Sequence, residues 1–190
     1  MKKIISKNFK DHLNVLQCTL ESLSKSIELA SYEMVKTLEN GGTIFWFGNG
    51  GSCADSQHLA AELTGRFKKD RKPLRSISLT ADNSVITCIA NDYSYDQIFA
   101  RQILGLVRKD DLVIAISTSG NSPNIVNGLR ITKDLGIKSI ALLGNDGGLS
   151  RDLTDLPIII PSNSTARIQE IHILIGHIMV EIVENRLGLS

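Results

Sequence analysis

The sequence predicts an α/β fold in which helices cover both faces of one parallel, doubly wound sheet of about five strands. Short apolar runs, each suited to one buried strand, alternate with longer segments that have helical spacing. Turns rich in glycine, serine and asparagine follow several of these runs, as is typical of strands that end beside a ligand. The 190 residues suffice for one such domain with a full core and are too few for two.

The composition argues against several other classes of protein. The net charge is +1 and the only dense basic segment is 66–75, so nucleic acid is not an expected partner. Cys18, Cys53 and Cys88 are odd in number and widely spaced, which fits a reducing cytoplasm better than disulfides or a cysteine zinc site. We expect neither a signal peptide nor a membrane span, because no window approaches 18 uncharged apolar residues.

Residues 1–40 are predicted to form an N-terminal helical segment used in oligomerisation. Apolar side chains recur there at alternating spacings of four and three, at Phe9, Leu13, Leu16, Leu20, Leu23, Ile27, Ala30 and Met34. A stripe of about four heptads needs a partner surface, and we expect a second copy of the chain to supply it. The alternative is one or two helices folded back on their own domain.

The first strand is predicted at 43–47, and it ends in the turn Gly48-Asn49-Gly50-Gly51-Ser52. This turn matches a dinucleotide-binding fingerprint only in part, because Cys53 stands where the third glycine should be. The glycines more simply let the backbone approach a sugar or a phosphate closely.

The helix predicted after this turn carries His58 and Glu62, which lie four residues apart and so share one face. Such a pair is commonly a surface pair, but its apolar neighbours indicate that this helix is not on open solvent. The basic, proline-containing segment 66–75 is most simply a solvated connection. Alternatively, one of its arginines reaches an anionic ligand from a neighbouring subunit.

The next elements are a strand at 75–79, a helix cap at 80–82 and a helix at 95–107. Between them, Asn91 and Asp92 suit either a plain turn or contacts to sugar hydroxyls.

The central strand, 112–116, runs into a turn rich in hydroxyl groups. These hydroxyls belong to Ser117, Thr118, Ser119 and Ser122. Pro123 suits the first turn of a helix, which makes Ser122 its N-cap. Free backbone N–H groups, the helix dipole and O–H donors at one point suit a phosphate held without ion pairing. The alternative is an ordinary, well-capped connection.

A helix to about residue 135, a strand at 139–143 and an edge strand at 157–160 complete a core spanning 43–162. The last helix, 165–187, is apolar almost all round and so must be buried, in our expectation between subunits. Gln169 and His177 lie about 80° apart around this helix and can face one site. His172 lies on the same side as Gln169, which leaves open which histidine points inward.

Five motifs in order resemble the bacterial phosphoheptose isomerases of the sugar-isomerase (SIS) domain superfamily. They lie at 48–52, 58–66, 91–92, 117–122 and 167–177. The resemblance spans nearly the whole chain and implies a single SIS domain over 1–190, a flavodoxin-like core and a cytoplasmic homotetramer. It also implies conversion of sedoheptulose 7-phosphate to D-glycero-D-manno-heptose 7-phosphate, the first step towards the heptose of lipopolysaccharide core or capsule.

The resemblance implies roles for individual residues. Phosphate would be held by Ser117, Thr118, Ser119 and Ser122, and the rest of the substrate by Asn49, Gly50, Gly51, Ser52, Glu62, Asn91, Asp92 and Gln169. Glu62 would be the general base and His177 the general acid. Relatives can carry Zn²⁺, one ion per subunit, for which the matching ligands are His58, Glu62, Gln169 and His177. Ala166, where some relatives place Asp, receives no role.

The implied chemistry needs such groups. Moving a carbonyl between neighbouring carbons requires one group to shuttle a carbon-bound proton and another to handle the oxygens. A metal would compete with the first task, because a carboxylate that binds zinc loses basicity. Two rival hypotheses are a non-catalytic SIS-domain protein that binds a phosphosugar or a protein, and an isomerase of another sugar phosphate.

Overall fold

Five parallel strands form one sheet in the computed structural model, which describes residues 1–188. The strands are β1 (Ile44–Gly48), β2 (Ser76–Ser78), β3 (Leu112–Ser117), β4 (Lys138–Leu143) and β5 (Leu156–Ile159). The helices are α1 (Lys2–Glu39), α2 (Gly51–Thr64), α3 (Asn83–Asp92), α4 (Ile98–Leu106), α5 (Pro123–Asp134) and α6 (Thr165–Arg186), with short 3-10 helices η1 (Tyr95–Gln97) and η2 (Gly148–Leu153). The strand order β2-β1-β3-β4-β5 is that of a flavodoxin-like fold, so the predicted fold class is confirmed.

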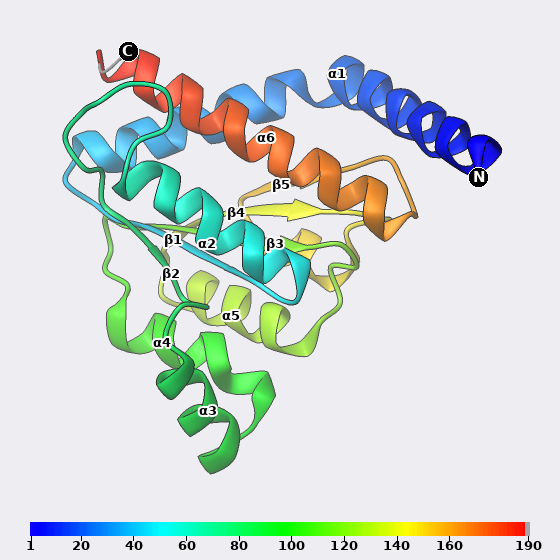
Figure 1. Cartoon of the computed structure of the whole chain (residues 1–190). Helices are drawn as coiled ribbons and strands as arrows, with labels where there is room; N and C mark the ends of the chain where they lie inside the picture. Colours follow the sequence, from blue (N-terminus) through cyan, green and yellow to red (C-terminus); the bar gives the residue numbers. More distant parts are fainter. Residues whose placement is uncertain (189–190) are drawn as a thin grey trace.

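The sheet is the middle of three layers (Figure 1). Helices α1, α2 and α6 cover one face and α3, α4 and α5 cover the other. Side chains of the strands alternate between the two cores: Trp46 and Ile114 join the first cluster, whereas Phe47 and Ala115 join the second. Both faces are therefore apolar, which explains why the strands read as continuous apolar runs.

Local signals placed the element boundaries to within a few residues. Asp82 caps α3, where its carboxylate accepts a hydrogen bond from Val85 N at 3.0 Å. Ser122 occupies the N-cap of α5 with Pro123 after it, but its hydroxyl makes no bond to the helix backbone. β5 is an edge strand as predicted, and Pro157 is tolerated there because one side of the strand has no neighbour.

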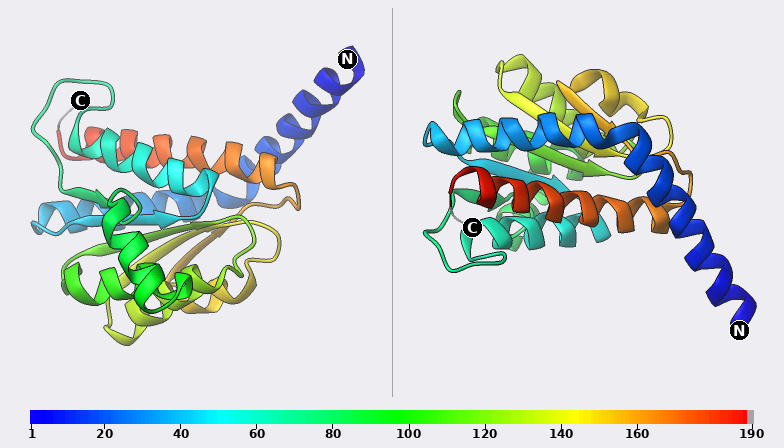
Figure 2. Two further views of the ribbon diagram at one scale, coloured as in Figure 1. Left: turned by 60° about the horizontal axis from the view of Figure 1, so that its bottom comes forward. Right: turned by 90° about the horizontal axis from the view of Figure 1, so that it is seen from above.

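Helix α1 is one helix of 38 residues whose apolar stripe divides into two parts. In its second half Ile27, Ala30 and Met34 are buried in the core of this chain. In its first half Phe9 and Leu13 remain 69% and 59% exposed. The first turns of α1 also project beyond the rest of the molecule (Figure 2). The second half of the helix therefore packs on its own domain, whereas the start of the helix contacts α6 through polar groups and leaves its apolar side chains exposed.

Helix α6 is covered largely within its own chain. Ile171, Ile175 and Met179 belong to the same core cluster as the second half of α1. Ile178 is 37% exposed, so only a small part of the apolar surface is left for a neighbour. The burial predicted for this helix thus arises mainly inside one chain rather than between subunits. In the part of the chain described, no helix has both the length and the apolarity that crossing a bilayer requires.

His172 is the histidine of α6 that points into the core. Its side chain is fully buried, and its Nε2 lies 3.0 Å from the carbonyl oxygen of Leu143, so Nε2 carries the proton and donates it. Burial lowers the pKa of His172 from 6.5 to about 4, and the bond to Leu143 opposes the shift only in part. The imidazole is therefore a neutral structural group that ties α6 to the end of β4.

We predict that His172→Gln makes folding stability less sensitive to acid. The unfolded chain takes up a proton near pH 6.5, whereas the folded chain resists it until about pH 4. Stability should therefore fall as pH falls through this window, by up to about 3 kcal/mol, and the amide of the introduced glutamine keeps an N–H donor without titrating. Urea unfolding of both proteins at a series of pH values measures the difference. Parallel pH profiles would contradict the assignment of this effect to His172.

Candidate active site

Two of the predicted turns lie side by side at the carboxyl edge of the sheet. The β1–β3 register pairs Gly48 with Ile116, so the turn after each strand starts at the same level. Asn49 in the first turn and Asn124 at the start of α5 exchange two side-chain hydrogen bonds, both 2.8 Å. Asn124 is buried and was not predicted, because an asparagine in the first turn of a helix has no distinctive sequence signal. The pair ties the two turns into one surface.

The hydroxyl-rich turn is held by its own side chains. Gly120 has φ +65°, and a Cβ at this residue would collide with the carbonyl oxygen of Gly147. Its N–H donates to Ser117 Oγ at 3.1 Å, and Asn121 N–H donates to Ser119 Oγ at 3.2 Å. The Ser122 hydroxyl and the N-terminus of α5 stay available for a ligand. This arrangement suits an anion such as a phosphate.

Three titratable side chains from α2 and α6 come together further along α2, in the second half of that helix. His58 Nε2 lies 3.1 Å from Glu62 Oε1, and the rings of His58 and His177 meet edge to face with 5.0 Å between centroids. One ligand atom from each of the three residues lies within 4.8 Å of the others. Two imidazoles and a carboxylate at such distances form a donor set that suits a zinc ion.

Close contact between α2 and α6 produces this meeting. A Cβ at Gly176 would lie 2.5 Å from a methyl carbon of Leu59, so the lack of a side chain lets the helices touch. At the other end of α2, the Gln169 side chain packs on Gly51, where a Cβ would lie 2.7 Å from its amide nitrogen. Gln169 and His177 therefore both face α2, but Gln169 lies at the start of this helix and His177 beside its second half, so their meeting at one site stays a prediction.

The surroundings of His177 favour its neutral form. Burial has the largest effect and lowers the pKa of His177 below its ordinary value of 6.5. The neighbouring His58 lowers the pKa further, and the carboxylate of Glu62 opposes both effects. A neutral imidazole is able to accept a proton at one nitrogen, donate one from the other, or bind a metal.

Comparison with known proteins identifies the family. The SIS domain family matches residues 8–144. Phosphoheptose isomerase of Aliarcobacter butzleri is 49% identical, over 99% of this chain and 100% of its own length. Structures of phosphoheptose isomerases from Neisseria gonorrhoeae and Francisella tularensis, each 36% identical, match with TM-scores of 0.92 and 0.93 and cover 97% and 96% of this chain, and 98% and 97% of their own. The chain belongs to the phosphoheptose isomerase family.

Two residues that the family resemblance assigned to the substrate lie at the end of α3. Asn91 and Asp92 are exposed, and the Asn91 amide donates to the Asp92 carboxylate at 2.8 Å. Within residues 1–188 no hydrogen bond joins them to the other predicted residues. Tyr95, just beyond them, does reach the site, because its hydroxyl donates to Asn49 Oδ1 at 3.3 Å. The assignment of Asn91 and Asp92 stays a prediction.

The basic segment 66–75 is more than the solvated connection that its composition suggested. The Arg71 side chain is 1% exposed and forms an ion pair with Glu184. The Phe67 ring stacks on His177, with 5.4 Å between centroids and 23° between ring planes. The sequence offered no signal for either contact, since the partners lie more than 100 residues away.

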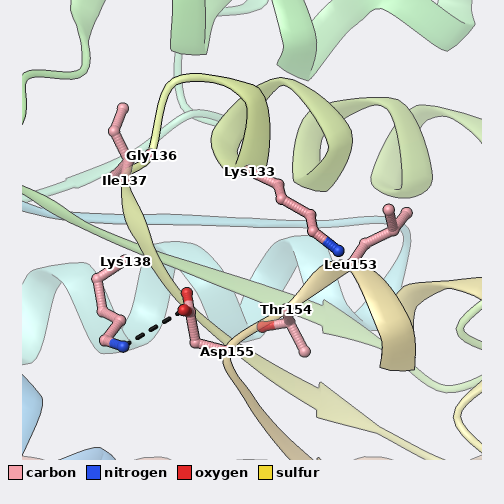
Figure 3. A pocket seen from close by; sticks show the side chains of 7 residues that line it. All are labelled: Lys133, Gly136, Ile137, Lys138, Leu153, Thr154 and Asp155. Carbon is pink, nitrogen blue, oxygen red and sulfur yellow. Dashed lines mark hydrogen bonds and ion pairs between the residues drawn. The ribbon is translucent and has the colours of Figure 1, made fainter.

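The opposite edge of the sheet holds a separate pocket of about 400 Å³ (Figure 3). It lies where β4 and β5 begin, and its two lysines are already engaged. Lys138 pairs with Asp155 at 3.3 Å, and Lys133 donates to the Asp152 carbonyl at 2.9 Å. Ligands of such sheets usually bind at the carboxyl ends of the strands, whereas this pocket lies at the amino ends, so it does not enter the candidate site of this phosphoheptose isomerase family member.

Proposed function

We propose that the chain isomerises sedoheptulose 7-phosphate to D-glycero-D-manno-heptose 7-phosphate, a precursor for lipopolysaccharide core or capsule. The observation that carries the proposal is the meeting of Glu62 and His177 at the α2–α6 contact, in a chain whose two strand-end turns are tied together by Asn49 and Asn124. The relative at 49% identity is named for this activity. A protein that only binds a phosphosugar would not need an acid–base pair.

Glu62 and His177 divide the proton transfers of the reaction. A proton must leave the carbon beside the carbonyl, an enediol must form, and the proton must return to the neighbouring carbon. The Glu62 carboxylate moves this carbon-bound proton. His177, whose lowered pKa keeps the ring neutral, passes protons between the two oxygens of the enediol.

Substrate binding divides between the two turns. The phosphate is held by Ser117, Thr118, Ser119 and Ser122, and the sugar chain by Asn49, Gly50, Gly51, Ser52, Asn91, Asp92 and Gln169. The phosphate end carries no reacting bond, so its contacts serve to hold the reacting carbons in place near Glu62. The rigid turn around Gly120 supports this role.

The side chains of His58, Glu62 and His177 also fit a zinc ion. Gln169, whose amide packs on Gly51 at the start of α2, is the fourth proposed ligand. When bound, zinc would polarise a substrate oxygen and stabilise negative charge there. Glu62 is then shared between two tasks, because a carboxylate bound to zinc is a weaker base.

We also propose a homotetramer. The exposed apolar face on the first half of α1, which includes Phe9, Leu13 and Leu20, requires cover from another copy. This face continues towards α6, where Ile178 is exposed. Sedimentation equilibrium should give four times the chain mass of 20.8 kDa, and a stable monomer at micromolar concentration would overturn the proposal.

Glu62→Gln should abolish isomerisation while the fold and phosphate binding persist. We expect kcat to fall at least 100-fold, since loss of a general base typically costs 10² to 10⁴. NMR of sedoheptulose 7-phosphate with the purified protein follows the aldose product directly. Glu181→Gln, an exposed glutamate on α6, is the matched control and should retain full turnover. A Glu62→Gln protein with wild-type kcat would remove the proposed base.

Zinc should bind at about one ion per chain, and His58→Gln should weaken it at least tenfold, because removing one ligand leaves the set incomplete. Competition with a chromophoric chelator measures the affinity without reference to turnover. Loss of isomerisation in chelator and recovery on adding zinc would make the ion necessary for turnover. Failure of the wild-type chain to bind zinc would overturn the proposed site.

A further inference from the structure

Arg71 and Glu184 form a buried ion pair behind the proposed active site. Arg71 Nε lies 2.6 Å from Glu184 Oε1, and the two side chains are only 1% and 2% exposed. Burial opposes ionisation of Glu184, but hydrogen bonds from Arg71 and from the backbone N–H groups of Lys68 and Phe67 outweigh it and hold the pKa of the carboxyl below its ordinary value. Both groups are therefore charged at neutral pH.

The rest of the guanidinium binds the end of helix α2. Nη2 donates to the carbonyl oxygen of Glu62 at 2.7 Å, and Nη1 donates to that of Leu63 at 2.8 Å. The last carbonyls of a helix have no partner within the helix, so a side chain that binds them fixes the final turn. Glu62 belongs to this turn. Arg71 therefore holds Glu62 by its backbone carbonyl.

Glu184 also binds the backbone of the basic segment 66–75, which carries the Phe67 ring that stacks on His177. Its two carboxylate oxygens accept hydrogen bonds from Phe67 N and Lys68 N, both at 3.2 Å. The Phe67 ring, placed in this way, stacks on His177. One ion pair therefore connects the backbone of Glu62 with the residue that covers His177.

We propose that Arg71, neutralised by Glu184, is a positioning residue for the isomerase reaction, because it fixes the last turn of α2 and holds Phe67 over His177. The proposal rests on the proposed function of Glu62 and His177. Arginine suits this task because its planar fork reaches Glu184 and two carbonyls at once. A lysine ammonium pairs with Glu184 as a point charge and cannot keep the same set of bonds.

Arg71→Lys is the decisive variant, since it keeps the charge and loses the fork. We expect kcat to fall at least tenfold with KM within twofold of the wild-type value, because the substrate-binding turns are untouched and only the acid–base pair is displaced. The matched control is Glu181→Gln, which breaks an exposed pair between the same loop and helix, Lys68–Glu181 at 2.6 Å, and should change neither constant. A kcat for Arg71→Lys within twofold of wild type, or a loss confined to KM, would overturn the proposal.

A second variant covers the case in which Arg71→Lys is poorly folded. The double change Arg71→Met with Glu184→Gln leaves no unpaired buried charge, and the amide oxygen of the introduced glutamine accepts from one of the two loop N–H groups, so much of the lost stability should return. The thermal unfolding midpoint of each protein is measured by circular dichroism, and its kcat is then measured at a temperature below that midpoint. Recovered stability with kcat still reduced at least tenfold supports the positioning role, whereas recovery of kcat together with stability overturns it.

The failure of the positioning role is distinguishable from the failure of the proposed function. If the wild-type protein forms no product, the proposed function fails. If the wild-type protein is active, Glu62→Gln is inactive and Arg71→Lys is fully active, only the positioning role fails.

Discussion

The contact between Gly176 and Leu59 is the constraint on which the site depends. His58 and Glu62 come from α2, while Gln169 and His177 come from a helix that follows the whole sheet. His58, Glu62 and His177 meet only if the two helices lie nearer to each other than ordinary side chains allow, and the missing Cβ of Gly176 permits that approach. At the start of α2, Gly51 also lacks a Cβ, and this lets the Gln169 side chain of α6 pack on it. The reactive groups therefore share one helix–helix contact rather than a flexible loop.

Two kinds of local structure supply the two needs of a phosphosugar isomerase. Strand ends and helix starts supply backbone N–H groups and hydroxyls, which suit an anion without changing its protonation. The facing helices supply imidazole and carboxylate groups, whose proton affinity depends on burial and on each other. The parallel register brings the first set together, and the bonds between Asn49 and Asn124 hold it. The acid–base groups and the anion-binding groups are thus supplied by different elements of the fold.

Much of this arrangement could be predicted from the sequence, because it depends on local signals. Apolar runs marked the strands, and glycine and serine clusters marked the turns after β1 and β3. What could not be predicted depends on long-range pairing. Arg71 looked like a solvated cation because its partner Glu184 lies far along the chain, and the stacking of Phe67 on His177 has the same origin. The heptad stripe of α1 showed that cover was needed, but periodicity alone does not say which half the chain covers itself.

The polar groups at the amino-terminal ends of the strands differ from those at the carboxyl-terminal ends in what they bind. At the amino-terminal ends the Asp111 carboxylate accepts hydrogen bonds from Thr43 N and Arg108 N, and Asp155 accepts one from Ser139 N. These groups satisfy one another and offer little to a ligand, whereas the Ser122 hydroxyl at the other edge is uncommitted. The polar groups at the amino ends of the strands thus stabilise the fold, whereas the Ser122 hydroxyl at the carboxyl ends is free to bind a ligand. Substitutions in the loops at the amino ends would change these hydrogen bonds without touching any residue of the proposed active site.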